Sequence, residues 1–353
     1  MSYKPDRRRV LIGAAALAAP MIGHRRARAA EQIYIGSPGG EYDEIMKRAI
    51  DDPFTKATGI QVTRVGVSNG KILAMVRAKD LEIDIADLSS TAVLTLERLG
   101  ALAPIDYDKW QFAKKSDIAP GLLLTHGAPI YNLAHCMVYN TKAFPAGKRP
   151  KTWADAWDVE RFPGPRAFPD MAFSQAHFEF ALRADGVPKD KLYPLDLDRS
   201  LKSFSKIRPK VVKFFTTGAL SAQIFTDEEA VVGSTTSGRA QTMVDKGAPV
   251  AIEWNDHLLF AECLVVFKDG KNVSAAQKFV DFAGQASAQA AFAKDLKYGP
   301  ANVKGFELLP PEIAKTMPGH PDTRDLAIHV DLGWWADNRE RATDLWNKWM
   351  LLG

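Results

Sequence analysis

IDIADLSSTAVLTLERL, residues 83–99, joins a strand pattern directly to a helix pattern. The pattern over 83–88, which is apolar apart from Asp84 and Asp87, is typical of a strand, and the apolar spacing over 93–99 is typical of a helix. The polar residues 89–91 mark the turn between the two. A strand followed at once by a helix is the repeating unit of an α/β sheet.

The same order occurs elsewhere in the chain. We expect strands over 32–35 and 60–67, followed by helices from Glu41 and over 70–77. Strands that alternate with helices predict a doubly wound α/β sheet. Further along, the patterns predict separate strands at 134–139, 250–253 and 261–267, a loop at 163–169, and a helical tail from Asp322 whose tryptophans pack in the core.

The first 30 residues have the features of an export signal. Arg7-Arg8-Arg9 precedes a weakly apolar run over 10–23 that is too short to span a bilayer. Ala27-Arg28-Ala29 is a cleavage site of the small-x-small type. We therefore expect a twin-arginine signal peptide over 1–30, cleaved near Ala29 or Ala30, and a periplasmic mature protein.

The charge of the remaining chain is close to neutral. The whole chain has 46 Lys and Arg against 42 Asp and Glu, and residues 31–353 alone carry a net charge of −2. Because no basic stripe interleaved with aromatic residues occurs, we expect no nucleic-acid partner. A chain of 353 residues rarely builds one core, so we expect two domains.

Catalytic and metal-binding motifs are missing from the sequence. It contains no H-E-x-x-H, no G-x-S-x-G, no phosphate-binding P-loop and no dinucleotide-binding glycine fingerprint. The histidines have no metal-ligand spacing. Cys136 and Cys263 lie in strand-like apolar runs, which favours buried free thiols over a disulfide. The sequence therefore predicts a protein that is not an enzyme and that uses no metal or cofactor.

Several short motifs resemble, in order along the chain, those of polyamine-type extracellular solute-binding proteins. They are GGEY at 39–42, DPF at 52–54, TGI at 58–60, DIADLSS at 84–90, VYNT at 138–141, WADAWD at 153–158, GS at 233–234, GRA at 238–240, EWN at 253–255 and KYGP at 297–300. Each motif is weak alone. Their order over nearly all of residues 31–353 makes the chain similar to this family.

The resemblance implies a type II periplasmic-binding fold, in which two α/β lobes are joined by crossing strands. Each lobe would be a doubly wound mixed sheet flanked by helices. Lobe 1 would consist of residues 31–130 and 255–305, and lobe 2 of residues 131–254 and 306–353 with the C-terminal helices. Such a protein would be a monomer that closes on a small molecule and hands it to the permease of an ABC importer.

The resemblance also implies which residues hold a cationic amine in the cleft. A carboxylate offsets the lost hydration of a cation, and aromatic faces help to hold it. Phe260 and Glu262 occupy the places of an aromatic residue and an acid that bind the amine in the family, so we expect Glu262 to contact the ammonium group. The other expected ligand-binding residues are Tyr42, Tyr298, Ser89, Ser90, Gly40, Asp87, Trp254 and Thr217.

Three places depart from the polyamine pattern. Gly39, Thr91 and the triplet Thr236-Ser237-Gly238 stand where that pattern has aromatic residues, which predicts a wider and more polar cleft. A short diamine, a substituted amine or an opine-like conjugate fits such a cleft as well as spermidine does.

Three alternatives stay open at this point. Glu262 could pair with a structural Arg or Lys instead of a ligand. The ligand could be anionic or zwitterionic, held at a helix N-terminus with help from Arg239. An exported hydrolase is the third, although the sequence offers no nucleophile–base pair for it.

Overall fold

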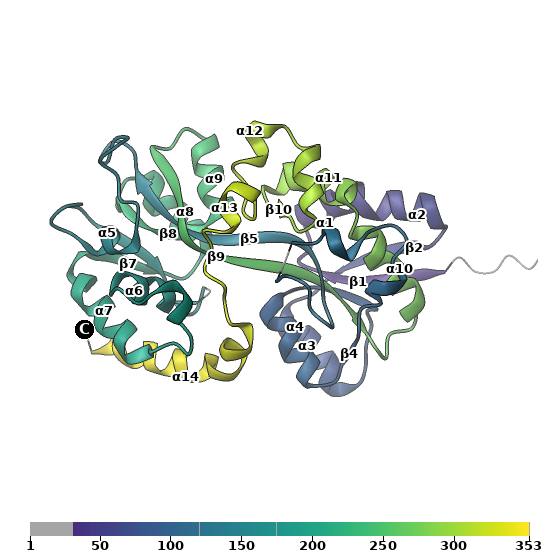
Figure 1. Cartoon of the computed structure of the whole chain (residues 1–353). Helices are drawn as coiled ribbons and strands as arrows, with labels where there is room; N and C mark the ends of the chain where they lie inside the picture. Colours follow the sequence, from purple (N-terminus) through teal and green to yellow (C-terminus); the bar gives the residue numbers. More distant parts are fainter. Residues whose placement is uncertain (1–30, 120, 174, 353) are drawn as a thin grey trace, which may run out of the picture. The chain divides into compact units, whose positions relative to one another are not determined.

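Two long strands, β5 (Ala128–Asn140) and β9 (Val250–Phe267), run side by side through the middle of a large sheet (Figure 1). The computed structural model describes residues 31–119, 121–173 and 175–352. The other strands are β1 (Gln32–Ser37), β2 (Gln61–Gly66), β3 (Ile85–Ser89), β4 (Leu102–Ala103), β6 (Arg166–Pro169), β7 (Val211–Phe215), β8 (Val232–Thr236) and β10 (Gly299–Pro300).

The strand order shows how the long pair joins two halves. It is β2-β1-β3-β9-β5-β8-β6-β7, with β4 beside β9 and β10 beside β5. Pairing is parallel between β1 and its neighbours β2 and β3, and also between β6 and its neighbours. The crossing strands β5 and β9 run antiparallel to each other and to β3 and β8. The expected mixed α/β architecture with crossing strands is therefore confirmed.

Helices cover both faces of each half (Figure 1). They are α1 (Glu41–Met46), α2 (Asp52–Thr58), α3 (Asn69–Ala78), α4 (Ser90–Arg98), α5 (Trp153–Trp157), α6 (Phe178–Ala184), α7 (Leu197–Ile207), α8 (Gly218–Thr226), α9 (Ser237–Asp245), α10 (Val273–Ala283), α11 (Ala286–Leu296), α12 (Pro311–Ala314), α13 (Pro321–Arg324) and α14 (Leu332–Leu351). Each half thus buries one apolar cluster on each face of its part of the sheet.

Polar side chains fix where several of these helices begin. Ser68, Ser89 and Thr217 each accept a hydrogen bond from a backbone N–H in the first turn of α3, α4 and α8. Asp331 does the same for α14. Such caps satisfy amide groups that have no partner within the helix. The predicted turn at 89–91 is therefore the cap and first residues of α4.

The predicted break in the second crossing strand was wrong. Residues 250–253 and 261–267 belong to one strand, and the strand predicted at 134–139 begins already at Ala128. Polar residues such as Asn255 and Asp256 interrupt the apolar pattern between the two runs. Pairing between β5 and β9 occurs on both sides of residues 254–257, which form a bulge with no partner in β5 and in which Asp256 has a φ of 52°.

Two further predictions need correction. The predicted loop at 163–169 contains strand β6, where the buried Arg166 donates hydrogen bonds to the carbonyls of Ala156, Gly164 and Phe162. The tail is not helical from Asp322, because only one turn (α13) precedes residues 325–331, which we call the strap. The strap follows the crossing strand, with a bridge between Ile328 and Leu258.

The tryptophans and cysteines lie as expected. Trp335 and Trp346 of α14 are fully buried in the cluster that also holds α6 and α7. Cys136 and Cys263 are buried free thiols. No helix within the described ranges is long and apolar enough to cross a membrane. The expected signal peptide lies outside the described residues.

The expected division into lobes stays a prediction. The packing differs from it in one detail, because Phe306, Leu309 and Met317 join the cluster of β1 and α10 in the first half. We had assigned residues after 305 to lobe 2. The short strand β10 explains the difference, since it pairs with the start of β5 and directs the following chain over the first half.

Gly233 in β8 provides a test of the second half. A Cβ atom at this position would lie 1.9 Å from the carbonyl oxygen of Ala167 in the neighbouring strand. Because a backbone atom cannot move aside cheaply, we expect Gly233→Ala to lower the free energy of unfolding by about 3 kcal/mol in urea denaturation. Gly70→Ala is the control, since its nearest new neighbour is 3.8 Å away. Equal stability of the two variants would contradict the packing of β6 against β8.

Candidate ligand-binding cleft

A cavity of about 540 Å³ lies between the two halves of the sheet. Ser89 at the end of β3 and Thr236 at the end of β8 both line it. Open α/β sheets bind ligands outside the carboxyl ends of their strands, and sites for small molecules have about this volume. The complete lining is Asn69, Ser89, Thr91, Ala92, Thr95, Leu133, His135, Phe173, Gln175, Thr236, Phe260, Glu262 and Arg339.

Glu262 lies on the wall of this cleft, in the middle of β9. Its strand neighbours are Ser89 on one side and Tyr131 on the other. Because alternate residues of a strand face the same side, Asp87 points to the same face of the sheet as Glu262. Glu262 is half-buried and forms no ion pair with a Lys or Arg of the described chain. The alternative in which Glu262 pairs with a structural Lys or Arg is therefore not supported by the described residues.

Asp87 is a second carboxyl beside Glu262. It is 8% exposed, and its Oδ2 atom accepts a hydrogen bond from the Tyr42 hydroxyl. Its other oxygen, Oδ1, has no hydrogen-bond partner among the residues described. Burial raises the pKa of Asp87 to about 8, and burial together with the charge of Asp87 raises the pKa of Glu262 well above its usual value. Two carboxyls in such a place ionise together only when a cation joins them.

Three tyrosines, Tyr42, Tyr131 and Tyr298, lie close to this carboxyl pair. The rings of Tyr131 and Tyr298 are stacked with centroids 4.8 Å apart, and Tyr42 meets Tyr131 edge to face at 6.4 Å. Burial raises the pKa of Tyr131 well above its usual range, so its hydroxyl stays protonated. Tyrosine faces next to carboxylates are well suited to a cationic group. The sequence analysis missed Tyr131, because it placed the start of this strand at residue 134. In the structure Tyr131 belongs to β5 and pairs with Glu262.

The facing wall of the cleft comes from the second half. The amide oxygen of Gln175 is buried and has no hydrogen-bond partner in the described ranges. Arg339 reaches the cavity from α14, and Thr236 contributes a hydroxyl group. Sequence reasoning missed Gln175 and Arg339. The tail was interpreted as packing helix only, and nothing local indicates that α14 returns to the cleft.

The remaining predicted residues lie in different places. Phe260 lines the cleft as expected. Ser90 is buried, and its hydroxyl donates a hydrogen bond to the carbonyl of Ala261. Thr217 is the exposed cap of α8, and Trp254 packs against His257 with centroids 5.2 Å apart.

Gly40 precedes α1 with φ of 65°, a conformation that favours glycine. None of Gly40, Thr217 and Trp254 lines the cleft cavity, and neither does Ser90. These four residues were expected in the ligand site, and the geometry gives them roles in capping, turns or packing. Tyr42, Asp87 and Tyr298 were expected there too and do not line the cavity either.

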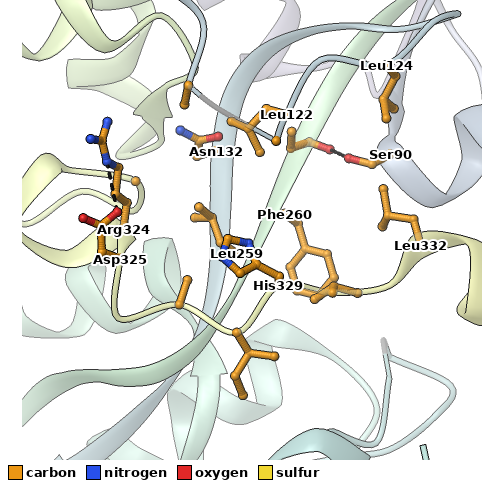
Figure 2. A pocket seen from close by; sticks show the side chains of 17 residues that line it. Ser90, Leu122, Leu124, Asn132, Leu259, Phe260, Arg324, Asp325, His329 and Leu332 are labelled. Atoms are coloured by element: carbon orange, nitrogen blue, oxygen red, sulfur yellow. Dashed lines mark hydrogen bonds and ion pairs between the residues drawn. The ribbon is translucent and has the colours of Figure 1, made fainter. Parts of the chain in front are cut away.

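A second cavity, of about 260 Å³, lies on the opposite face of the crossing strands (Figure 2). Asn132 and Ala261, which are paired across β5 and β9, line it, whereas Glu262 faces the cleft. Phe260 borders both cavities. We call this second space the strap cavity, because strap residues 325 and 327–330 form one of its walls.

Comparison with known proteins places this two-part architecture in a family. Residues 49–317 match the family described as bacterial extracellular solute-binding protein. The chain belongs to this family. Its relatives are substrate-binding proteins, which is consistent with the absence of an enzymatic motif.

Three relatives are similar over nearly their full length. The gamma-aminobutyric acid-binding protein of Pseudomonas aeruginosa is 28% identical over 327 residues, which cover 90% of this chain and 91% of that protein. A solved GABA receptor is 32% identical, with a TM-score of 0.80 and coverage of 90% of this chain and 97% of that one. A binding protein of A. tumefaciens R10 in complex with agropinic acid is 29% identical, with a TM-score of 0.70 and coverage of 91% and 99%.

The family membership confirms the broader predictions. The fold is that of type II periplasmic-binding proteins. Solute-binding proteins of this family capture a small molecule in the periplasm and deliver it to the permease of an ABC importer. The three relatives above are named for GABA or agropinic acid, so a polyamine is not confirmed as the ligand type.

Proposed function

We propose that this solute-binding protein captures a small zwitterion, with a protonated amine at one end and a carboxylate at the other. The observation that carries the proposal is the pair of opposite charges across one cavity. Glu262 lines the cleft from the crossing strand, and Arg339 lines it from α14. A zwitterion offers each of these side chains a partner of opposite charge.

The amine end belongs at the carboxyl pair. An ammonium group there would contact Glu262, which lines the cavity, and its charge would also act on Asp87, which does not line it. The stacked rings of Tyr131 and Tyr298 supply an aromatic surface on the same side. Removing a cation from water is costly unless such partners replace the lost hydration. The family pattern already implied Glu262, Asp87, Tyr42 and Tyr298 as contacts, and this proposal adds Tyr131 to them.

The acid end belongs at the facing wall. Arg339 and the hydroxyl of Thr236 are donors there, and the hydroxyl of Thr91 is another on the near side. A polyamine would instead bring a second ammonium group toward Arg339, and like charges repel. The names of the relatives favour the same class, because GABA carries one amine and one carboxyl group.

Arg339 can be tested with two ligands that differ only at the acid end. We expect GABA to bind the mature protein more tightly than 4-aminobutanamide, in which an amide replaces the carboxylate. Arg339→Gln should weaken GABA binding about 10-fold or more and leave 4-aminobutanamide nearly unchanged, since only GABA loses a charged hydrogen bond. Calorimetry measures both affinities.

Putrescine and agropinic acid complete the comparison. Tighter binding of putrescine than of GABA or agropinic acid would return the assignment to a polyamine. Equal loss of GABA and 4-aminobutanamide in the Arg339→Gln variant would show that the side chain does not recognise the carboxylate. Lys348→Gln, at the far end of the same helix, is the control for helix charge.

A further inference from the structure

The strap cavity has the properties of a second binding site. Its volume of about 260 Å³ exceeds that of core cavities which hold a benzene molecule, about 150 Å³. Leu122, Leu124, Leu259 and Leu332 contribute apolar side chains to its wall (Figure 2). Arg324, Asp325 and His329 also line it, and the first two form an ion pair with each other at 3.4 Å. A neutral, mostly apolar molecule with one or two rings matches this size and this lining.

One polar atom in this cavity has no partner. Asn132 is fully buried, and its Oδ1 atom accepts no hydrogen bond within the described ranges. A buried acceptor that is left unpaired lowers the stability of the fold. In Figure 2 the amide oxygen of Asn132 is turned toward Leu122, on the side of the cavity.

The orientation of the Asn132 amide follows from its other contact. The Nδ2 atom donates to the carbonyl of Pro300 at 3.0 Å. A carbonyl only accepts, so the amide nitrogen must face Pro300 and the oxygen must face away from it. Gly319 lies close on the nitrogen side, because a Cβ atom at this glycine would be 2.5 Å from Nδ2. Gly319 on the nitrogen side and Leu122 on the oxygen side both line the cavity, so the Asn132 amide lies at its wall.

We propose that the strap cavity binds a small neutral molecule that is mostly apolar and carries one N–H or O–H donor for Asn132. The donor would satisfy the buried oxygen, and the leucine side chains would cover the rest of the molecule. An occupant would contact the crossing strands and the strap together. The site differs from the cleft, which lies on the opposite face of β5 and β9 and contains Glu262 and Arg339.

Indole and 1-methylindole test the proposal, because they differ in the single N–H donor. We expect indole to bind the mature protein with one-to-one stoichiometry and 1-methylindole to bind roughly 5- to 10-fold more weakly. Leucine methyl groups report the location in NMR spectra. The methyl signals of Leu122 and Leu259 should shift on addition of indole, and those of Leu133 in the cleft should not.

Several outcomes would overturn this assignment. Absence of any methyl shift at millimolar indole would show that the cavity takes no such molecule. Shifts confined to Leu133 would place indole in the cleft, and equal affinity for both probes would exclude a role for the Asn132 oxygen. Ala327→Leu, which fills the cavity, should abolish the Leu122 and Leu259 shifts while circular dichroism stays unchanged.

The test of the strap cavity does not depend on which ligand the cleft binds. Glu262→Gln should bind indole as the unmodified protein does, whether or not any amine binds in the cleft. Competition by GABA against indole would mean that the two share one site, and that result would also contradict the proposal.

Discussion

Glu262→Gln is expected to weaken binding of an amine-bearing ligand by about 2 kcal/mol or more, which is roughly a 30-fold loss of affinity. The variant keeps the size of the side chain and removes its charge. The ammonium group then loses its charged hydrogen bond on the cleft wall, where Glu262 lies beside Asp87 and the stacked tyrosines. Calorimetry with GABA measures the effect.

The control for this variant is a glutamate outside the cleft. Glu82 is exposed and approaches Lys71 at 3.8 Å, so Glu82→Gln should leave ligand affinity unchanged. Unchanged affinity in Glu262→Gln would remove this residue from the site. A loss shared equally by both variants would indicate a general charge effect instead.

Asp87→Asn is expected to stabilise the empty protein at pH 8 by a few kcal/mol. Asparagine is neutral at all pH values, and its oxygen still accepts the hydrogen bond from Tyr42. In the natural protein, ionisation of the buried Asp87 beside Glu262 is costly, which is why its pKa is raised to about 8. The site thus carries a cost in stability that a bound cation relieves.

The sign of the pH dependence follows from proton counting. Between the usual aspartate pKa of 3.8 and about 8, the folded protein holds a proton on Asp87 that the unfolded chain releases. Stability therefore falls as the pH rises through this window. From pH 6.5 to 8 we expect a loss of about 1.5 kcal/mol in the free energy of unfolding.

Buried histidines act in the opposite direction but in a lower window. Burial lowers the pKa of His135 and His257 to about 4, and that of His177 further below its usual value. The unfolded chain binds protons at these residues below about pH 6.5, so stability falls as the pH is lowered from there. The range from pH 6.5 to 8 therefore lies above the window of the histidines and reports on the carboxyl pair of Asp87 and Glu262, since the pKa of Glu262 is raised as well.

Urea denaturation of the empty protein and of Asp87→Asn at several pH values tests this prediction. The curve of the natural protein should fall between pH 6.5 and 8, and that of the variant should fall less steeply, because the buried Glu262 still titrates in it. Parallel curves would show that Asp87 ionises normally in the folded state. Asp80→Asn, which changes an exposed aspartate of the same half, controls for the change in net charge.

Local patterns were enough to predict the fold class. The alternation of strands and helices over 32–99 reflects side-chain periodicity, which depends only on neighbouring residues. Glu262 also stood out from its apolar strand, because a carboxyl group between Ala261 and Cys263 is costly without a partner. The Ser89 cap and the buried tryptophans of α14 were readable for the same local reason.

Long-range pairing decided what local patterns could not. Segments more than 100 residues apart make β9 one strand, since β5 pairs with it on both sides of residues 254–257 and the Asp256 N–H donates to the carbonyl of Leu326. The break predicted there was wrong for this reason. The strap and the start of α14 likewise depend on contacts with the crossing strand.

The chemistry of the cleft shows the same division. By itself the sequence determined the α/β units, the position of Glu262 in its strand and the resemblance to solute-binding proteins. Only the tertiary structure brought Asp87 beside Glu262, turned Gln175 and Arg339 into the same cavity, and left Asn132 facing a second one. Periodicity records which face a residue takes on its own element, whereas the distance between two elements is set by the packing of the whole chain.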